Sequence, residues 1–354
     1  MIAPKVSIAK LYRTSDPLED RSRYVRLDRN ERTIPFPPEV TAALIARITP
    51  ETLVSYPSPE PFYRKLARWL KVDREMLLLS NGSDAAIKSV FETYVEPGDE
   101  VVFPSPSYAM YSVYCEMFGA VKVNVHYDQN LRIETEALLR QINPRTRLVI
   151  VANPNQPIGT VIPQGDLVRL IASCAQSDIP VLIDEAYYPF HDETLLPFVS
   201  QFPNLIVTRT FSKACGLASI RLGYLVSHAD NITQLFKTKT MHDLNAFSVA
   251  FGEFIVENDW VMWDYVKQVR AGRAYLEKAF EELGLEALQS HANFLLIRLP
   301  ESQDAHGLVE ALKHEGYLIR GPSGPPLERC IRLTVGPEDQ MHMFMDAFGR
   351  CYKR

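Results

Sequence analysis

The chain has 354 residues, which exceeds the length of one small domain and fits one large domain with a smaller one. Hydrophobic residues make up 46% and charged residues 23%, as in ordinary globular proteins, and a formal net charge of −5 leaves no broad basic field for nucleic acid or anionic lipid. The sequence shows neither the apolar core of a signal peptide nor a membrane-spanning apolar run of roughly 20 residues, so we expect a cytoplasmic protein that binds neither membrane nor nucleic acid.

The cysteines of this chain are scattered and odd in number, and no pair has the spacing of zinc ligands. We therefore expect reduced thiols and no metal site. The five are Cys115, Cys174, Cys215, Cys330 and Cys351.

The N-terminal part is weakly patterned. Residues 1–37 are polar, dotted with proline and only weakly periodic, which indicates an arm. Helices are predicted over 38–48 and 62–70, and residues 56–61 between them must be extended or turning because residues before proline avoid the helical region.

From about residue 76, short apolar stretches that predict strands alternate with amphipathic stretches that predict helices. Such alternation indicates an α/β fold with a mostly parallel sheet covered by helices on both faces. The predicted strands are 76–79, 100–103, 120–125, 147–152, 180–183, 205–208 and 222–226, and the helices among them are 85–94, 108–118, 135–142 and 165–175.

After about residue 230 the pattern changes to helices over 232–239 and 246–257, followed by a long amphipathic helix over 259–283. A compact α+β unit follows, with strands at 294–299, 317–320 and 330–335 and helices at 304–315 and 337–349. We therefore predict an N-terminal arm (1–37), a large ligand-binding domain (38–258), a connecting helix (259–284) and a small C-terminal domain (285–354).

Ligands of such sheets bind beyond the carboxyl ends of the strands, and several polar residues fall there. Lys213 lies between Ser212 and a run of small residues, with Arg221 further along. A lysine there can form an imine with an aldehyde cofactor, and a hydroxyl and a guanidinium suit phosphate oxygens. Taken alone, this stretch is equally typical of a solvated lysine on a turn.

Three further motifs follow predicted strands. Asp184 can pair with a pyridinium, with Tyr187 as a donor to a phenolate, although a strand-end aspartate also commonly caps a helix. Ser83 and Asp84 stand at a helix start, where backbone N–H groups and the helix dipole favour an anion, although a plain N-cap has the same sequence. The amides of residues 153–159 form a rigid loop or a generic turn cluster.

Pyridoxal phosphate needs a lysine, an acid beside its ring nitrogen, a donor to its phenolic oxygen, a phosphate cup and an aromatic over its ring. Tyr108, at the head of a predicted helix, is the candidate aromatic, although a buried core tyrosine fits that position as well. The sequence thus offers a candidate for every requirement.

In this order, the motifs resemble those of the fold-type I, pyridoxal-phosphate-dependent aminotransferases of class I/II. Histidinol-phosphate aminotransferases are the nearest branch, and threonine-phosphate decarboxylases are a sibling. The resemblance runs from Leu27-Asp28-Arg29-Asn30-Glu31 to Ile331-Arg332-Leu333-Thr334-Val335-Gly336. It implies a large domain with a mostly parallel seven-stranded sheet flanked by helices, and a smaller α+β C-terminal domain.

The resemblance also implies residue roles. Lys213 matches the cofactor-bound lysine that shuttles a proton, Asp184 the partner of the pyridine nitrogen, and Tyr187 the donor to the phenolic oxygen. Tyr56 matches a tyrosine that reaches the phosphate in the neighbouring subunit, which implies a homodimer with shared sites. The remaining matches are Ser83, Asp84, Ser212 and Arg221 for the phosphate cup, Tyr108 for the stacking aromatic, and Asn30, Arg320 and Arg332 for the substrate.

One position departs from the family pattern. The family has asparagine before Pro-x-Gly, where this chain has Gln156, a side chain with the same donor and a longer reach. With glutamine at this position we still expect pyridoxal phosphate as the cofactor, but the amine substrate can differ from that of the family.

The leading interpretation is an aminotransferase of amino-acid biosynthesis that moves an amino group from an amino acid or an amino-alcohol phosphate to a 2-oxo acid such as 2-oxoglutarate. The alternatives are an α-decarboxylase of the threonine-phosphate type, or a paralogue that uses another amine. A non-catalytic ligand-binding module fits least, because Lys213 and Asp184 are intact and no DNA-binding segment is attached.

Overall fold

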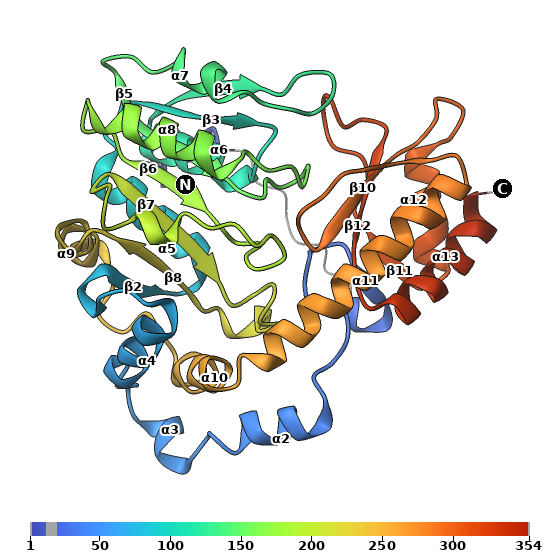
Figure 1. The fold of residues 1–354 in the computed structure, drawn as a ribbon, viewed down its shortest axis with the longest axis horizontal. Helices are drawn as coiled ribbons and strands as arrows, with labels where there is room; N and C mark the ends of the chain where they lie inside the picture. Colours follow the sequence, from blue (N-terminus) through green and yellow to red (C-terminus); the bar gives the residue numbers. More distant parts are fainter. Residues whose placement is uncertain (1, 12–19, 353–354) are drawn as a thin grey trace.

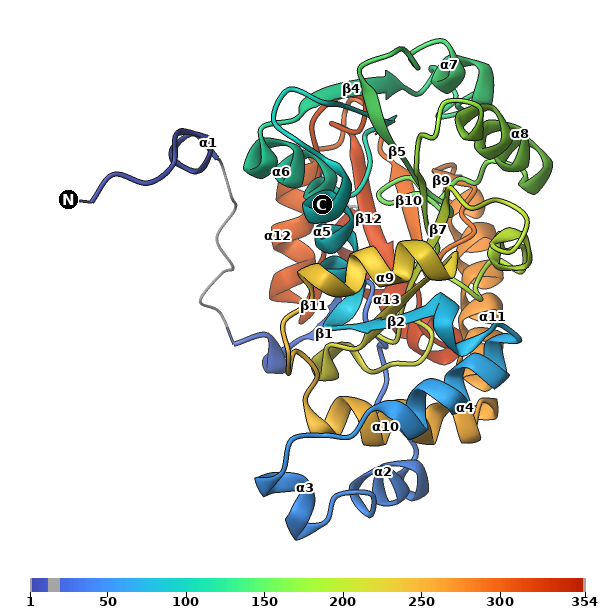
Figure 2. The same ribbon diagram turned by 90° about the vertical axis from the view of Figure 1, so that its left-hand side faces the viewer.

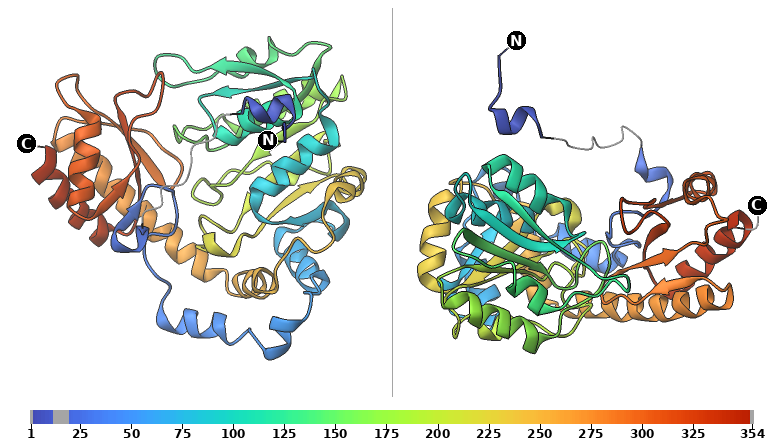
Figure 3. Two further views of the ribbon diagram at one scale, coloured as in Figure 1. Left: turned by 180° about the vertical axis from the view of Figure 1, so that it is seen from behind. Right: turned by 90° about the horizontal axis from the view of Figure 1, so that it is seen from above.

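The computed structural model describes residues 2–11 and 20–352. A seven-stranded sheet with its helices occupies one side of the molecule, and a smaller three-stranded sheet occupies the other (Figure 1). The long helix α11 (Trp260–Glu282) runs from the first side to the second, as the view from above also shows (Figure 3). The parts of the chain that we assigned to two domains therefore build separate sheets.

The large sheet has the strand order β2-β8-β7-β6-β5-β3-β4. Strand β8 runs antiparallel to both of its neighbours, and the remaining pairs are parallel, which confirms the predicted mostly parallel seven-stranded sheet. The strands are β2 (Leu77–Ser80), β3 (Glu100–Ser105), β4 (Val121–His126), β5 (Thr146–Ala152), β6 (Val181–Asp184), β7 (Leu205–Thr210) and β8 (Gly223–Ser227).

Both faces of this sheet are buried, which is why its central strands read as continuous apolar runs. Along β5, Leu148 and Ile150 enter the core on one face, and Val149 and Val151 enter the core on the other. Helices α5 (Gly82–Tyr94), α6 (Ala109–Phe118) and α9 (Ala229–Thr238) pack on the first face; α4 (Glu60–Leu70), α8 (Gln164–Ala175) and α10 (Ala246–Glu257) contribute to the core of the second.

The smaller sheet is antiparallel, in the order β12-β10-β9, with β9 (Glu286–Leu288), β10 (Phe294–Arg298) and β12 (Cys330–Thr334). Helices α12 (Ala305–His314) and α13 (Glu338–Tyr352) and strand β11 (Tyr317–Ile319) complete this side. All five cysteines are buried, and none forms a disulfide bond within residues 2–11 and 20–352.

The N-terminal arm is more ordered than we predicted. It contains a short helix α1 (Val6–Ala9) and a strand β1 (Val25–Leu27), which pairs in parallel with β11 of the C-terminal unit (Figure 2). A three-residue strand has no periodicity to detect in the sequence, and its partner lies at the other end of the chain. The part of the arm around β1 therefore belongs structurally to the C-terminal side of the molecule, whereas α1 contacts α6 of the large-sheet side.

Several predicted boundaries were wrong by a few residues. Helix α2 (Pro38–Ile45) ends before residue 48, and α7 (Thr135–Leu139) ends before residue 142. A further helix, α3 (Pro50–Val54), and strand β9 were not expected. Among the helices of residues 2–11 and 20–352, none combines the length and the apolar character that a bilayer crossing requires.

Candidate active site

A cavity opens where β5, β6 and β7 end and α5 begins. Because parallel strands end at one edge of their sheet, side chains far apart in the sequence meet there. Every predicted cofactor-binding residue except Tyr56 lines this cavity. Its lining comprises Ser83, Asp84, Tyr108, Ala152, Pro154, Gln156, Asp184, Ala186, Tyr187, Thr210, Ser212, Lys213 and Arg221.

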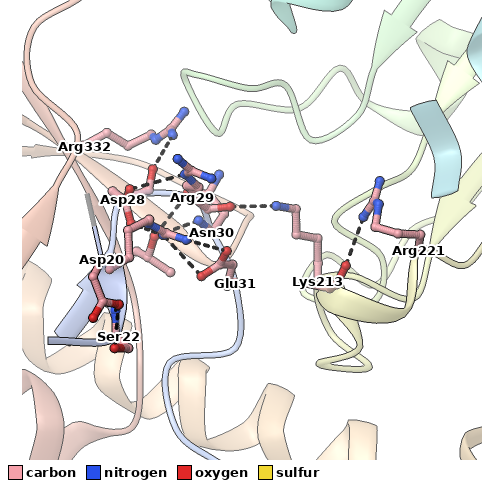
Figure 4. Close-up of polar contacts among 12 residues, drawn as sticks. Asp20, Ser22, Asp28, Arg29, Asn30, Glu31, Lys213, Arg221 and Arg332 are labelled. Atoms are coloured by element: carbon pink, nitrogen blue, oxygen red, sulfur yellow. Dashed lines mark hydrogen bonds and ion pairs between the residues drawn. The ribbon is translucent and has the colours of Figure 1, made fainter. Parts of the chain in front are cut away.

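Lys213 stands in the loop after β7. Its Nζ donates a hydrogen bond of 2.8 Å to the backbone carbonyl of Arg29 in the arm, a contact drawn in Figure 4. Burial lowers the pKa of Lys213 to about 8, and the nearby cations Arg332 and Arg221 act in the same direction. The amine is therefore far more available as a neutral nucleophile than that of an exposed lysine.

Asp184 ends strand β6 and is only 5% exposed. Its carboxylate accepts hydrogen bonds from the hydroxyl of Tyr111 (2.7 Å), the hydroxyl of Thr208 (3.2 Å) and the backbone N–H of Ala186 (3.2 Å). Burial raises the pKa of Asp184 to about 6, and these three donors oppose that rise. The sequence did not single out Tyr111, because an aromatic side chain on a helix facing a sheet reads as core.

The hydroxyl group of Tyr187 makes two hydrogen bonds. Its hydroxyl donates to Oε1 of Gln156 (2.7 Å) and accepts from Nδ2 of Asn30 (2.8 Å). Asn30 is 1% exposed, adopts a left-handed φ of 57°, and accepts a hydrogen bond from Thr334 of β12. Asn30 thus does not line the cavity and instead connects Tyr187 to the C-terminal sheet.

The start of α5 and the guanidinium of Arg221 form one end of the cavity. Arg221 donates from Nη1 to the hydroxyl of Ser212 (3.3 Å). Gly82, with φ +79°, allows this approach, since a Cβ there would stand 2.7 Å from Nη2 of Arg221. The helix N-terminus, the hydroxyls and the guanidinium together suit a bound anion such as a phosphate.

Tyr108 forms one wall of the cavity. Its hydroxyl donates to Oδ1 of Asp84 (3.0 Å), and its ring lies edge-on to that of Tyr111, with the centroids 5.6 Å apart. Burial raises the pKa of Tyr108 far above its ordinary value, so its hydroxyl stays protonated. Its ring is therefore held at the cavity by a hydrogen bond and by packing.

Arg332 and Arg320 lie outside the cavity lining. Arg332 donates from Nη2 to the carbonyl of Asp28 (3.0 Å), and its buried Nε has no hydrogen-bond partner in residues 2–11 and 20–352. Figure 4 shows it on the opposite side of arm residues 28–31 from Lys213. Arg320 is exposed and pairs with Arg332 through backbone hydrogen bonds of 2.9 and 3.0 Å.

Tyr56 is not among the residues that line the cavity of its own chain. Its side chain is 74% exposed and stacks on the ring of His242, with centroids 4.0 Å apart. Exposed apolar side chains surround the same part of the sequence, including Leu53 and Val54. Within a single chain, Tyr56 therefore has no role at the cavity.

The residues of the cavity fit pyridoxal phosphate. Gly82 leaves the space beside Arg221 that a phosphate needs, Lys213 offers a nucleophilic amine, and Asp184 offers a buried carboxylate. Within the described part of the chain, no group of three or more His, Cys, Asp or Glu side chains is arranged to hold a metal ion. Fold and cavity together define a pyridoxal-phosphate-dependent transferase of fold type I.

Comparison with known proteins identifies the family. Residues 23–348 match the profile of the family described as aminotransferase class I and II. Histidinol-phosphate aminotransferase 1 of Burkholderia lata is 35% identical over 92% of each chain. The crystal structure of histidinol-phosphate aminotransferase from Sinorhizobium meliloti in complex with pyridoxal-5′-phosphate superimposes with a TM-score of 0.89, at 25% identity, over 99% of this chain and 97% of that one.

L-threonine-O-3-phosphate decarboxylase from Porphyromonas gingivalis superimposes with a TM-score of 0.79 over 93% of this chain and 100% of that one. At 21% identity, this likeness shows the fold alone. The chain belongs to the class I and II aminotransferases. It is an aminotransferase that uses pyridoxal 5′-phosphate and acts on small amino and keto substrates.

Proposed function

We propose that the amino donor is an amino-alcohol phosphate of the histidinol-phosphate kind and that the acceptor is a 2-oxo acid such as 2-oxoglutarate. The observation that carries this proposal is the buried Nε of Arg332, which has no hydrogen-bond partner among the described residues and lies across arm residues 28–31 from Lys213, with Arg320 next to it. A guanidinium with free donors suits a phosphate, and the names of the relatives point to the same donor.

The cavity residues have distinct tasks in this proposal. When bound, the cofactor supplies an aldehyde for covalent attachment and an electron-accepting ring. Lys213 provides the amine for attachment and afterwards moves the proton at the substrate's α-carbon. Asp184 keeps the ring nitrogen protonated, and Gln156 with Tyr187 faces the phenolic oxygen. The phosphate is held by Ser83, Asp84, Ser212 and Arg221, and Tyr108 stacks on the ring.

Asn30 is proposed to act on the substrate side through Tyr187, because its side chain is already engaged by that hydroxyl. We further propose that Tyr56 serves the cofactor of a partner subunit in a homodimer, since it is exposed and does not line the cavity of its own chain. We also propose that the chain divides into an arm, a large domain, a connecting helix and a small domain. A cytoplasmic location is proposed because the cysteines of the described residues form no disulfide bond.

The test is a panel of amino donors assayed with 2-oxoglutarate. The panel contains histidinol phosphate, histidinol, threonine phosphate and common amino acids, and glutamate and carbon dioxide are both measured. Glutamate formation fastest with histidinol phosphate supports the proposal, and Arg332→Gln should then raise KM for that donor far more than for histidinol. Carbon dioxide release from threonine phosphate without glutamate would instead establish the decarboxylase.

A further inference from the structure

Tyr111 is buried beneath the cavity and contacts its acid directly. It lies on α6 with no exposed surface, and its ring packs edge-on against Phe103 and Tyr108. Its hydroxyl makes the shortest of the three hydrogen bonds to the carboxylate of Asp184, 2.7 Å to Oδ2. The other two donors, Thr208 and Ala186, both contact Oδ1 at 3.2 Å. Among the described residues, Tyr111 is therefore the only hydrogen-bond donor to Oδ2 of Asp184.

The direction of this hydrogen bond is fixed by chemistry. The carboxylate can only accept, and burial beside Asp184 raises the pKa of Tyr111 well above its ordinary value, so the phenol keeps its proton. A donor to a carboxylate stabilises the ionised form over the neutral one. Tyr111 therefore works against the burial that pushes Asp184 toward its neutral form.

The basicity of the Asp184 carboxylate determines whether the proton between it and the cofactor's ring nitrogen lies on the ring or on the carboxylate. An ionised carboxylate beside a pyridine nitrogen favours the arrangement with the proton on the ring. A more basic Asp184 would take that proton, and the ring would become a weaker electron acceptor. A donor that lowers the basicity of Asp184 thus keeps the ring protonated without touching it.

We propose that Tyr111 is a positioning residue of the transamination reaction, which keeps Asp184 ionised and thereby keeps the ring nitrogen of the bound cofactor protonated. This inference rests on the proposed role of Asp184 and extends it to a residue outside the cavity lining. Helix α6, which begins after Tyr108, therefore has a second function three residues further along the chain.

The experiment measures the proton on the ring nitrogen directly. Wild-type protein and Tyr111→Phe are loaded with pyridoxal phosphate carrying ¹⁵N in its ring, and the ¹⁵N chemical shift is recorded near neutral pH. We expect the wild type at the protonated value. In Tyr111→Phe the ratio of ring-protonated to unprotonated cofactor should fall by about 10- to 100-fold, as the loss of a charge-assisted hydrogen bond implies. The half-reaction with L-glutamate should slow in parallel.

Two variants calibrate this result. Asp184→Asn supplies the limit without a carboxylate, and Thr208→Val removes a longer contact to the other oxygen and should shift the signal in the same direction by less. Tyr63→Phe is the matched control, because the hydroxyl of Tyr63 is also buried but accepts from the backbone N–H of Leu79, away from the site. It should leave the ring signal at the wild-type value.

A wild-type ¹⁵N shift in Tyr111→Phe overturns the inference. If that variant does not fold, a wild-type shift in Thr208→Val overturns it, since a donor to Asp184 would then have no influence on the ring. Either result leaves the proposed function standing, because wild-type turnover with the amine panel tests that separately.

Discussion

Lys213 combines burial with two neighbouring guanidinium groups, and this setting changes what a lysine can do near neutral pH. Its pKa falls to about 8, compared with the ordinary 10.5. Only the neutral amine attacks an aldehyde. The protein therefore prepares its nucleophile before the cofactor arrives.

We predict that the rate at which the cofactor-free protein takes up pyridoxal phosphate rises with pH and levels off above about 8, the pKa of the folded protein. Stopped-flow absorbance measures the rate, and borohydride reduction followed by peptide mass spectrometry locates the bond. Lys213→Ala should show no reduced adduct, while Lys71→Ala, at an exposed lysine, should behave as wild type. A rate that keeps rising to pH values near 10.5 would contradict the lowered pKa.

At the scale of elements, the start of α5 depends on one glycine. Gly82 has a left-handed φ of +79°, and a Cβ at this position would collide with Nη2 of Arg221 at 2.7 Å. Gly98 shares the first property, with φ +95°, but a Cβ there meets nothing within 4 Å. An alanine at Gly98 would therefore strain only the backbone, whereas an alanine at Gly82 would strain the backbone and also crowd the anion site.

We predict that Gly82→Ala and Gly98→Ala both lower the free energy of unfolding, by about 1–2 kcal/mol for the strained backbone. Only Gly82→Ala should also weaken pyridoxal phosphate binding, by about ten-fold or more, because Arg221 must move away. Thermal unfolding of the cofactor-free proteins and fluorescence titration with the cofactor measure the two effects. Equal cofactor affinities of the two variants would show that Gly82 has no part in the phosphate end.

Two loops meet through a pair of histidines. His191 follows β6 and His291 precedes β10, and their ring centroids are 5.0 Å apart. Burial lowers the pKa of both histidines. Arg270 acts in the same direction at His191 and Arg273 at His291, whereas Glu193 opposes the shift at both rings, and Asp192 and Glu185 oppose it at His191. Protonation of either ring therefore opposes this contact between the two sides of the molecule.

The sign of the pH effect follows from these lowered pKa values. At pH values well above about 6.5 the histidines are neutral in the folded and unfolded chain, so they add no pH dependence. As the pH falls below that value, the unfolded chain takes up protons first, and the free energy of unfolding decreases until the folded pKa values are reached. We predict that His191→Gln loses less stability than the wild type between about pH 7 and about pH 5.5.

Urea unfolding at the two pH values measures this difference. His306→Gln, at an exposed position of α12, is the matched control and should keep the wild-type acid sensitivity. Identical losses in His191→Gln and the wild type would assign the acid sensitivity to other groups.

Much of the large sheet could be predicted because its strands are buried on both faces. Runs such as residues 148–152 are apolar throughout, and the helices between them show their periodicity. The position of the cavity could also be predicted, because residues at the ends of parallel strands, such as Asp184, lie along one edge of the sheet. Strand β1 could not be predicted, because its three residues are ordered only by β11, and the contacts of Asn30 and Tyr111 depend on packing between distant segments.

At the scale of the whole molecule, exposed apolar side chains gather near Tyr56 in the sequence and along the loop before α10. They include Leu53 (66% exposed), Val54 (85%) and Met241 (89%). Burial of such side chains is the usual source of stability in a homodimer. We propose that the second subunit of the proposed homodimer packs on this surface.

We predict that two defective proteins restore each other. Subunits with Lys213→Ala and subunits with Tyr56→Phe are mixed after dissociation and reassociation. If Tyr56 serves the partner's cofactor, each heterodimer has one site with both defects and one site with neither, so activity should exceed that of either parent. No recovery in heterodimers verified by mass spectrometry would place Tyr56 outside the neighbouring site.

The pairing of β1 with β11 has a consequence for how the protein is made. The two strands are separated by on the order of 300 residues, so at ribosomal speeds of about 5–20 residues per second the first strand waits many seconds for its partner. During that interval Asn30 has no C-terminal sheet to hold it, and its contact with Tyr187 cannot be fixed. The contact between Asn30 and Tyr187 is thus fixed only once β12 has been synthesised, so the arm takes its place beside Lys213 late in the synthesis of the chain.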